Sequence, residues 1–235
     1  MQALAGRLRR RLYPRRVARP RSAKGRARLT QERLAEVYPG TPVELCALRH
    51  RNAFELLAAT ILSAQTTDER VNQVTPTLFA RFPTPHDLAG ADPAEVEALI
   101  RPTGFFRAKT RSLLGMAAVV DTRFRGEVPV AMADLVTIPG VGRKTANVVR
   151  SVALDRPGLP VDTHVGRLAR RLGLTAETDP VKAELALNPL VPAPDRGLFS
   201  LRLILHGRAV CKAQKPRCPM CDLADFCPSA GIAGS

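Results

Sequence analysis

The sequence predicts an all-α fold, because helix start and stop signals recur along it and no stretch keeps the two-residue period of a strand for long. The composition agrees with this prediction: 45% of the 235 residues are hydrophobic, 4% are aromatic and there is no Trp. Many Ala, Leu and Val residues with few aromatic ones suit packed helices better than a β-sandwich. A chain of this length can bury a real core, as one domain or as two small ones.

Helix starts can be placed in chain order. Asn52 and Glu55 have the spacing of a capping box at the start of the apolar run in residues 54–62. Three later sites place a capping residue before a proline at the first helical position. They are Thr84-Pro85, Asp92-Pro93 and Asp179-Pro180. Residues 101–104 contain a proline and a glycine and end one helix before another begins near Phe105, so we expect short helices with short loops.

Residues 135–149 predict two short helices joined by a tight glycine turn. The chain turns through Gly140, Val141 and Gly142, where residues without Cβ permit positive φ and let another molecule approach the backbone. The first N–H groups of the second helix have no partner inside the helix, and the macrodipole places partial positive charge beside them. A phosphate is therefore expected to bind at this hairpin.

Lys144 stands in the first turn of the second hairpin helix. The helix dipole and the neighbouring Arg143 both disfavour an ammonium ion there, which is the condition that a nucleophilic lysine needs. The alternatives are a solvated helix lysine and a plain phosphate contact. Further along, Asp162 occupies the N-cap position of a helix that Gly173 ends, so a structural cap is the simplest interpretation of Asp162 alone.

Four of the five cysteines lie near the C-terminus with the spacing C-x6-C-x2-C-x5-C. They are Cys211, Cys218, Cys221 and Cys227. Disulfides are not expected in a chain whose other features are cytosolic, so four thiolates this close predict a metal site. The spacing leaves structural zinc and a four-cysteine iron–sulfur cluster both open. Cys46 has no partner in the sequence and is most simply a buried small residue.

The net charge of +15 is concentrated at the N-terminus, where residues 1–28 hold eleven Lys or Arg and no acid, which leaves +4 for the rest. We expect a disordered basic arm that is attracted to nucleic acid, with an organelle transit peptide as the alternative. No segment has the roughly 18 to 20 apolar residues that cross a membrane, so no membrane partner is expected. The expected location is the cytoplasm, beside the nucleoid in a bacterium, or an organelle or the nucleus in a eukaryote.

Five motifs together resemble the endonuclease III family of DNA repair glycosylases, over roughly residues 29–228. In chain order they are Leu62-Ser63-Ala64-Gln65-Thr66-Thr67-Asp68, the hairpin from Pro139 to Ala146, Val161-Asp162-Thr163-His164, Leu205-His206-Gly207-Arg208 and the four-cysteine loop. The resemblance implies a helix-hairpin-helix DNA glycosylase fold with two domains and a cleft between them. Residues 46–157 would form a six-helix barrel domain that contains the hairpin, and residues 29–45 with 158–235 a [4Fe-4S] cluster domain. The four cysteines would then hold iron rather than zinc.

The resemblance also implies a function. The protein would be a bifunctional DNA glycosylase and AP lyase in base excision repair, removing oxidised or saturated pyrimidines from damaged double-stranded DNA. Lys144 would attack the sugar C1′ and form a Schiff base, and β-elimination would cut the strand. Asp162 would stabilise positive charge at the sugar and assist proton transfer.

Further residues would bind DNA, and the protein is expected to be a monomer. The residue matching Gln65 fills the space left by the extruded nucleotide, and the one matching Phe105 wedges between the opposite bases, where many relatives carry an aliphatic side chain. The hairpin would bind a DNA phosphate, often through a monovalent cation, with contacts from Gly140, Val141, Gly142, Arg143 and Thr145. The alternatives are a polar helix-end cap for Gln65 and a core aromatic for Phe105.

Two other functions share some of these features. A monofunctional, adenine-removing relative shares the hairpin and the cluster, but it lacks a lysine at the position of Lys144 and has a catalytic glutamate about where Thr60 stands. A non-enzymatic hairpin DNA-binding module with a metal site explains the hairpin, the charge and the cysteines. It gives no reason for Lys144 and Asp162 to occur together.

Overall fold

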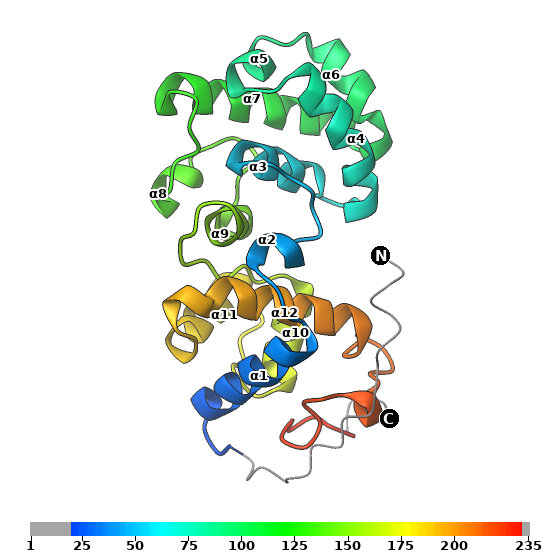
Figure 1. The fold of residues 1–235 in the computed structure, drawn as a ribbon, viewed down its shortest axis with the longest axis vertical. Coiled ribbons are helices and arrows are strands. Elements are labelled where there is room, and N and C mark those ends of the chain that lie inside the picture. The colour runs from blue at the N-terminus through cyan, green and yellow to red at the C-terminus, as the bar shows by residue number, and fades with distance from the viewer. Residues whose placement is uncertain (1–19, 232–235) are drawn as a thin grey trace.

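The computed structural model describes residues 20–231, and this part of the chain holds twelve α-helices, four short 3₁₀ helices and no strand. The all-α prediction is confirmed. Residues 1–19, most of the predicted basic arm, and residues 232–235 lie outside the described residues. Figure 1 shows the helices arranged as two lobes along the longest axis of the molecule.

The first lobe, the upper one in Figure 1, consists of consecutive elements from the middle of the chain. They are α3 (Ala53–Leu62), α4 (Asp68–Arg81), α5 (Pro85–Ala89), α6 (Pro93–Ile100), η1 (Arg101–Thr103), α7 (Phe106–Phe124), α8 (Met132–Leu135) and α9 (Arg143–Val152). All residues of α3 except Ala53 are buried, so this helix lies in the middle of the lobe. Its core extends through residues 48–152 and includes Leu201 from the other lobe.

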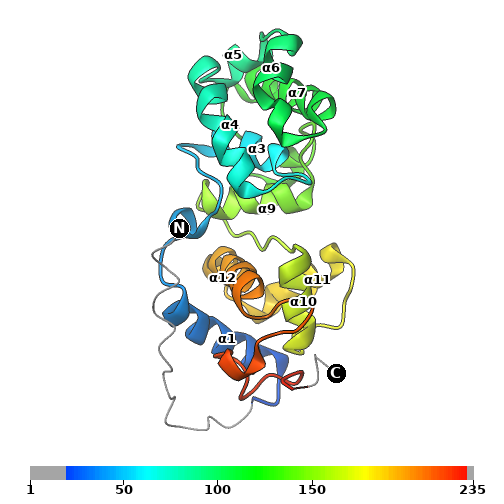
Figure 2. The ribbon, with the colours of Figure 1, turned by 90° about the vertical axis from the view of Figure 1, so that its right-hand side faces the viewer.

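The second lobe is built from both ends of the chain. Its elements are α1 (Ala23–Val37), α10 (Thr163–Arg171), α11 (Pro180–Leu187), η2 (Asn188–Leu190), η3 (Ala193–Asp195), α12 (Arg196–Ala209) and η4 (Cys218–Met220). Helix α12 contacts both α1 and α10, and Figure 2 shows it next to both. The guanidinium of Arg33 on α1 donates to Asp225 Oδ2 at 2.7 Å, so the two chain ends meet in this lobe. The short helix α2 (Pro42–Leu45) contacts α9 and α12, one from each lobe.

The prediction of a disordered arm over residues 1–28 is wrong for its last six residues, which form the first turns of α1. Ser22 caps this helix by accepting from the backbone N–H of Gly25. Arg26 donates through Nε to the carbonyl of Leu172 at 2.8 Å and through Nη2 to that of Gly173. These carbonyls follow the end of α10, where acceptors lack partners within the helix. Arg26 therefore provides hydrogen bonds to the carbonyls at the end of α10. The positive charge of the segment did not reveal this structural role.

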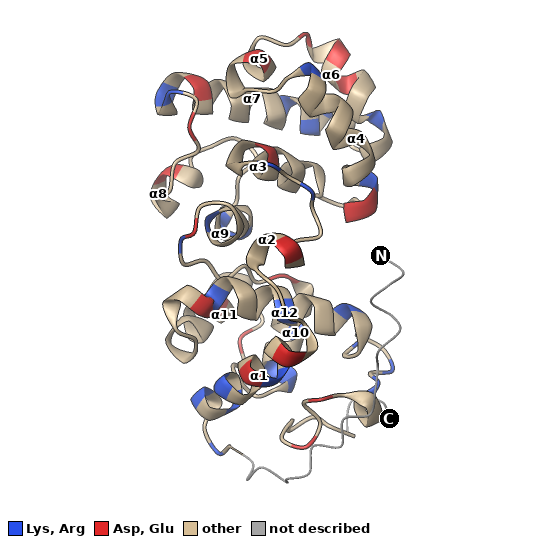
Figure 3. Ribbon diagram, viewed as in Figure 1, with Lys and Arg blue, Asp and Glu red and all other residues tan. Residues whose placement is uncertain are grey.

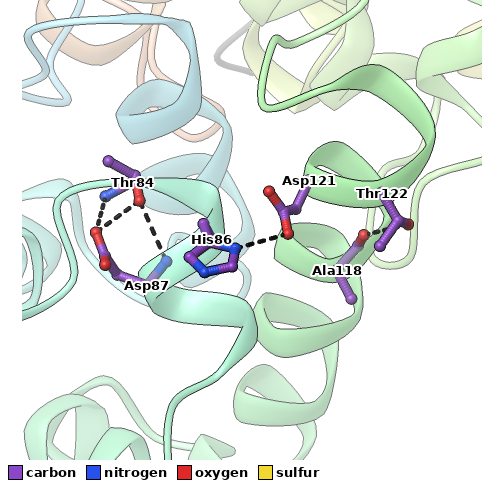
Figure 4. Close-up of polar contacts among 6 residues, drawn as sticks. All are labelled: Thr84, His86, Asp87, Ala118, Asp121 and Thr122. Carbon is purple, nitrogen blue, oxygen red and sulfur yellow. Dashed lines mark hydrogen bonds and ion pairs between the residues drawn. The ribbon is translucent and has the colours of Figure 1, made fainter.

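Local capping chemistry sets several helix boundaries as predicted. Asn52 Oδ1 accepts from Glu55 N at 2.9 Å at the start of α3, but the predicted capping box is not completed, because the Glu55 carboxylate accepts from Arg51 N instead. Thr84 and Asp87 form a reciprocal capping box at the start of α5 (Figure 4). In the same region His86 Nδ1 lies 3.0 Å from Asp121 Oδ2 on α7, and this hydrogen bond raises the pKa of His86. Helix α5 is thus fixed both by its own cap and by a contact with α7.

The two lobes meet where α9 packs against the second lobe with very little space. A Cβ on Gly158 would lie 2.5 Å from the carbonyl oxygen of Asn147, and one on Gly197 would lie 2.6 Å from Ser151 Cβ. Atoms cannot approach this closely, so both positions require glycine. The backbone that follows α9 therefore packs directly on α9 at Asn147. The start of α12 packs on α9 at Ser151, one turn after Asn147.

Charged residues are spread over both lobes in the part of the chain that the structure describes. Lys and Arg occur on helices of the first and the second lobe, with Asp and Glu interspersed among them (Figure 3). Within residues 20–231 no helix is both long and apolar enough to cross a membrane.

Replacing Gly158 by Ala tests the packing between the lobes. The added Cβ would overlap the carbonyl oxygen of Asn147, so we expect the free energy of unfolding to fall by about 1–3 kcal/mol. Urea denaturation measures this change. Gly90→Ala is the matched control, because the nearest atom to its Cβ is 3.8 Å away and its φ of −88° suits alanine. Equal unfolding midpoints for the two variants would contradict the packing argument.

Candidate active site and nucleic-acid interface

The predicted hairpin is present, and its second helix begins without a side-chain cap. Helix α8 is followed by a turn in which Gly140 has a φ of 78°, and α9 begins at Arg143 after Gly142 as its N-cap. The turn is closed by a hydrogen bond from Val141 N to Ile138 O at 3.0 Å. Because Gly142 has no side chain, no side-chain acceptor of its own satisfies the first N–H groups of α9. These donors remain suited to an anion.

Lys144 is exposed in the first turn of α9, whereas its neighbour Arg143 is bound within the protein. The guanidinium of Arg143 makes a two-bond ion pair with Glu184 of α11, with Nε–Oε2 at 2.7 Å and Nη2–Oε1 at 2.8 Å. Glu184 is buried, so this ion pair joins the two lobes beside the hairpin. The charge of Arg143 is therefore paired within the protein, although its side chain stays partly exposed, and Lys144 is the exposed lysine at this helix start.

Asp162 caps α10, as the sequence predicts. Its Oδ1 accepts from the backbone N–H of Val165 at 2.8 Å. The side chain is half-buried, and its second oxygen is not used in this cap. Lys144 and Asp162 thus lie at the starts of consecutive helices, α9 and α10, and within the described residues no ion pair joins them directly.

A pocket of about 290 Å³ brings together three of the residues predicted to bind DNA: Gln65, Phe105 and Gly140. The remaining lining residues are Ile61, Ala64, Ala108, Lys109 and Ser112. The three predicted residues come from different segments of the chain: the loop after α3, the residue before α7 and the hairpin turn. The structure therefore places these three segments around one pocket. Lys144 is not among the lining residues, but it follows Gly140 by four residues in the chain.

Gln65 and Phe105 share an unusual backbone conformation. Their φ angles are 54° and 48°, in the left-handed region that non-glycine residues rarely occupy. Such strain costs on the order of 1–3 kcal/mol at each residue and is concentrated at functional sites. The side chain of Phe105 is 67% exposed, so its interpretation as a core aromatic is wrong. Gln65 is also exposed, and its side chain makes no hydrogen bond to any residue between 20 and 231, which removes the helix-end cap as its role.

Sequence reasoning missed Lys109, which lines the pocket and is only 5% exposed. Burial lowers the pKa of its ammonium group. A signal was present in the sequence: Lys109 precedes Leu113 and Met116 by four and seven residues, so it lies on the apolar face of α7. A lysine on such a face needs internal hydrogen-bond partners.

The four cysteines of the C-terminal loop are free thiols, and each is half-buried. Arg171 Nη1 donates to Cys211 Sγ at 3.3 Å, and His206 Nε2 lies 3.2 Å from Cys221 Sγ. Burial raises the pKa of the Cys221 thiol to about 12, and the other three cysteines lie close enough to add to this rise. In residues 20–231 no three His, Cys, Asp or Glu side chains are already arranged to hold a metal ion. The donor types nevertheless suit a thiolate-bound metal.

Comparison with known proteins identifies the class first. Residues 58–193 match the family described as HhH-GPD superfamily base excision DNA repair protein. A thermostable thymine-DNA glycosylase that is only 22% identical shares the fold, with a TM-score of 0.77 over 89% of this chain and 97% of that chain. The fold and the hairpin therefore define a helix-hairpin-helix base excision DNA repair protein.

Closer relatives narrow this assignment. Endonuclease III of Synechocystis sp. is 52% identical over 198 residues, which cover 84% of this chain and 89% of that protein. Endonuclease III of Bacillus subtilis is 41% identical over 197 residues, 83% and 89% of the two chains. A solved non-covalent endonuclease III–DNA complex is 40% identical, with a TM-score of 0.82 over 89% of this chain and 97% of that chain. A trapped endonuclease III–DNA covalent intermediate matches with the same values. The chain belongs to the endonuclease III family.

Proposed function

We propose that this protein is a bifunctional DNA glycosylase and AP lyase of base excision repair, which removes oxidised or saturated pyrimidines from damaged double-stranded DNA. One observation carries the proposal: an exposed lysine, Lys144, stands at an uncapped helix start four residues after Gly140, which lines the same pocket as Gln65 and Phe105. A related endonuclease III has been trapped as a covalent intermediate with DNA, and such an intermediate requires a nucleophile on the enzyme.

Extrusion of the damaged nucleotide is the first step. A stacked base does not expose its glycosidic bond, so the nucleotide must leave the helix. Gln65 fills the vacated space with its amide, and Phe105 enters between the opposite bases with its ring. The exposure of both side chains and their position on one pocket support this division of roles.

The chemistry then centres on Lys144. Its neutral amine attacks C1′ of the sugar, the C1′–N bond breaks, and the base leaves with the bonding electrons and a proton. The sugar ring opens to give a Schiff base between Nζ and C1′. The iminium makes the C2′ proton acidic, and loss of that proton expels the 3′ phosphate by β-elimination. Water hydrolyses the Schiff base and releases the enzyme.

Asp162 acts on the same sugar while it caps α10. One carboxylate oxygen is occupied by Val165 N, which fixes the side chain in place. The other oxygen is proposed to stabilise positive charge that develops at C1′ and to accept a proton from Lys144. A cap of this kind orients the catalytic group at no further conformational cost.

The hairpin binds a phosphate next to the extruded nucleotide. The backbone of Gly140, Val141 and Gly142 forms the turn, and a monovalent cation bound at this turn would supply positive charge for the phosphate. Because the Arg143 side chain is paired with Glu184, its contribution and that of Thr145 are assigned to their backbone N–H groups at the start of α9. The protein acts as a monomer on DNA, and its affinity should fall steeply with salt.

The proposed domain boundaries follow the two hydrophobic cores: one lies mainly within residues 45–154, and the other is formed by residues 27–38 with residues 159–227. We assign residues 46–157 to the barrel domain, where the structure has seven α-helices, α3 to α9, rather than the six expected, because the short α5 and α8 count separately. Residues 29–45 with 158–235 are assigned to a cluster domain, with DNA in the cleft between the two. Cys211, Cys218, Cys221 and Cys227 would hold a [4Fe-4S] cluster. Bound there, the cluster would supply covalent cross-links within residues 211–227 and so stabilise the fold of this loop. Arg171, which donates to Cys211 Sγ, suits the anionic sulfur of such a site.

The two alternative functions have less support. A glutamate is required near position 60 for the adenine-removing type, but Thr60 occupies it and donates its hydroxyl to Leu56 O at 2.7 Å. A purely DNA-binding module gives no reason for Lys144 and Asp162 to occur together, or for a related endonuclease III to be trapped as a covalent intermediate with DNA.

Lys144→Gln tests the nucleophile. The amide cannot form a Schiff base, so we expect complete loss of the borohydride-trapped complex on abasic duplex DNA, with DNA binding retained. A denaturing gel detects the trapped complex and a mobility shift measures binding. Lys182→Gln, which changes an exposed lysine on α11, is the control and should trap like the unchanged protein. Continued trapping by Lys144→Gln would remove this lysine from the mechanism.

Asp162→Asn separates capping from catalysis. Asn caps helices as well as Asp, so the melting temperature should stay unchanged, whereas loss of the carboxylate should slow excision by about a hundredfold. Asp162→Ala should lose the same activity and, in addition, about 1 kcal/mol of unfolding free energy. Excision kinetics and thermal melting give the two readouts. An Asn variant with the full rate would restrict Asp162 to its structural role.

Cys218→Ser tests the cluster. The unchanged protein should be brown and contain about four irons per chain, and the variant should lose both colour and iron. Cys46→Ser is the control, because Cys46 packs against the core of the first lobe. If the unchanged protein is colourless and contains zinc, the cysteines hold zinc and the proposal of an iron–sulfur cluster is wrong.

A further inference from the structure

Lys109 is a buried cation without an acidic partner. Its side chain is 5% exposed, and within residues 20–231 no carboxylate lies at ion-pair distance from it. Its Nζ donates to the hydroxyl of Thr66 at 2.8 Å and to the backbone carbonyl of Thr103 at 2.8 Å. Charge-assisted hydrogen bonds of this kind are stronger than neutral ones. A buried ammonium is costly, so its retention here points to a specific task.

The two acceptors of Lys109 belong to the two strained loops. Thr66 directly follows Gln65, and Thr103 precedes Phe105 by two residues. The Thr66 hydroxyl also donates to the Thr103 carbonyl, so the three groups form a closed arrangement. The ammonium therefore joins the loop that carries Gln65 to the loop that carries Phe105 at a fixed separation.

Helix α7 extends this arrangement to the hairpin. Ser112, one turn after Lys109, lies against Gly140, because a Cβ on Gly140 would come within 2.9 Å of Ser112 Cβ. Gly115, a further turn along, accommodates Pro139, whose Cβ would lie 3.1 Å from a Cβ at position 115. Residues spaced by three share one face of a helix. One face of α7 thus contacts all three segments around the pocket.

We propose that Lys109 is a positioning residue, which holds the Thr66 and Thr103 loops together so that Gln65 and Phe105 enter the DNA as one rigid pair. This inference rests on the proposed function, and it adds a residue that touches neither the base nor the sugar. Both loops have their strained conformation before DNA binds, so extrusion of the nucleotide does not require a further loss of conformational entropy in these loops. Without the ammonium, the two side chains would have to find their positions independently in the DNA.

Lys109→Met keeps the length and the apolar stem but removes the donors. Two substrates separate its effects: a duplex with thymine glycol next to 2-aminopurine, and a single-stranded oligonucleotide with a preformed abasic site, which needs no extrusion. We expect the duplex excision rate and the rate of the 2-aminopurine fluorescence rise to fall about tenfold or more, because small displacements of positioned groups have effects of this size. Strand cutting on the single-stranded substrate should stay unchanged.

Thr66→Val provides a second, independent variant, since it removes the hydroxyl acceptor and leaves Lys109 in place. It should show the same selective loss, and the double variant should lose little more than either single one, because both changes break one arrangement. Arg81→Met is the matched control: it breaks the exposed Arg81–Glu95 ion pair in the same lobe and should leave both rates unchanged. If Lys109→Met does not fold, Thr66→Val decides the question.

The outcomes distinguish this inference from the proposed function. If the unchanged protein neither cuts an abasic site in duplex DNA nor is trapped on it, the proposed function fails. If it does both, but Lys109→Met and Thr66→Val extrude and excise normally, Lys109 has no positioning role. Equal losses on the two substrates would likewise overturn the inference, because they would show a general structural defect.

Discussion

The close packing of α9 against the second lobe is the constraint on which the site depends. Gly158 lies on the backbone of Asn147 with no space for a side-chain carbon, so the chain leaving α9 must turn back along the helix. This path leads directly to Asp162 at the start of α10. The helix that begins beside Lys144 and the helix that Asp162 caps are therefore held in a fixed relation by backbone contact, which is stiffer than contact between side chains.

Two ion pairs also join the lobes, one at α9 and one at α4. Arg143 reaches from α9 to the buried Glu184, and Arg208 on α12 lies 2.8 Å from Asp68 at the start of α4. The first pair neutralises the charge of Arg143 next to Lys144, so the two neighbouring cations differ in their environment: one is paired with a buried carboxylate and the other is exposed. The way the lobes are joined therefore affects the electrostatic surroundings of Lys144.

The sequence predicted the features that depend on neighbouring residues and missed those that depend on distant ones. The caps at Asn52 and Asp162 are formed within three residues, and the glycine turn of the hairpin is equally local, so each was recognisable. Lys109 bonds Thr66 across 43 positions, and Arg26 bonds Leu172 across 146. Only the packed fold brings such pairs together. For this reason the sequence did not reveal the role of Lys109, and the predicted basic arm wrongly included residues 23–28 of α1.

The meeting of the two chain ends in the second lobe has a consequence for the order of folding. The first lobe is continuous in sequence, so its helices can assemble as soon as they leave the ribosome, with short loops to close. The contact between Arg33 and Asp225 joins residues that are 192 positions apart, so it forms only after the chain has been made as far as Asp225. Helix α1 is therefore synthesised long before the cysteine loop that it contacts, and the second lobe is expected to assemble after the first.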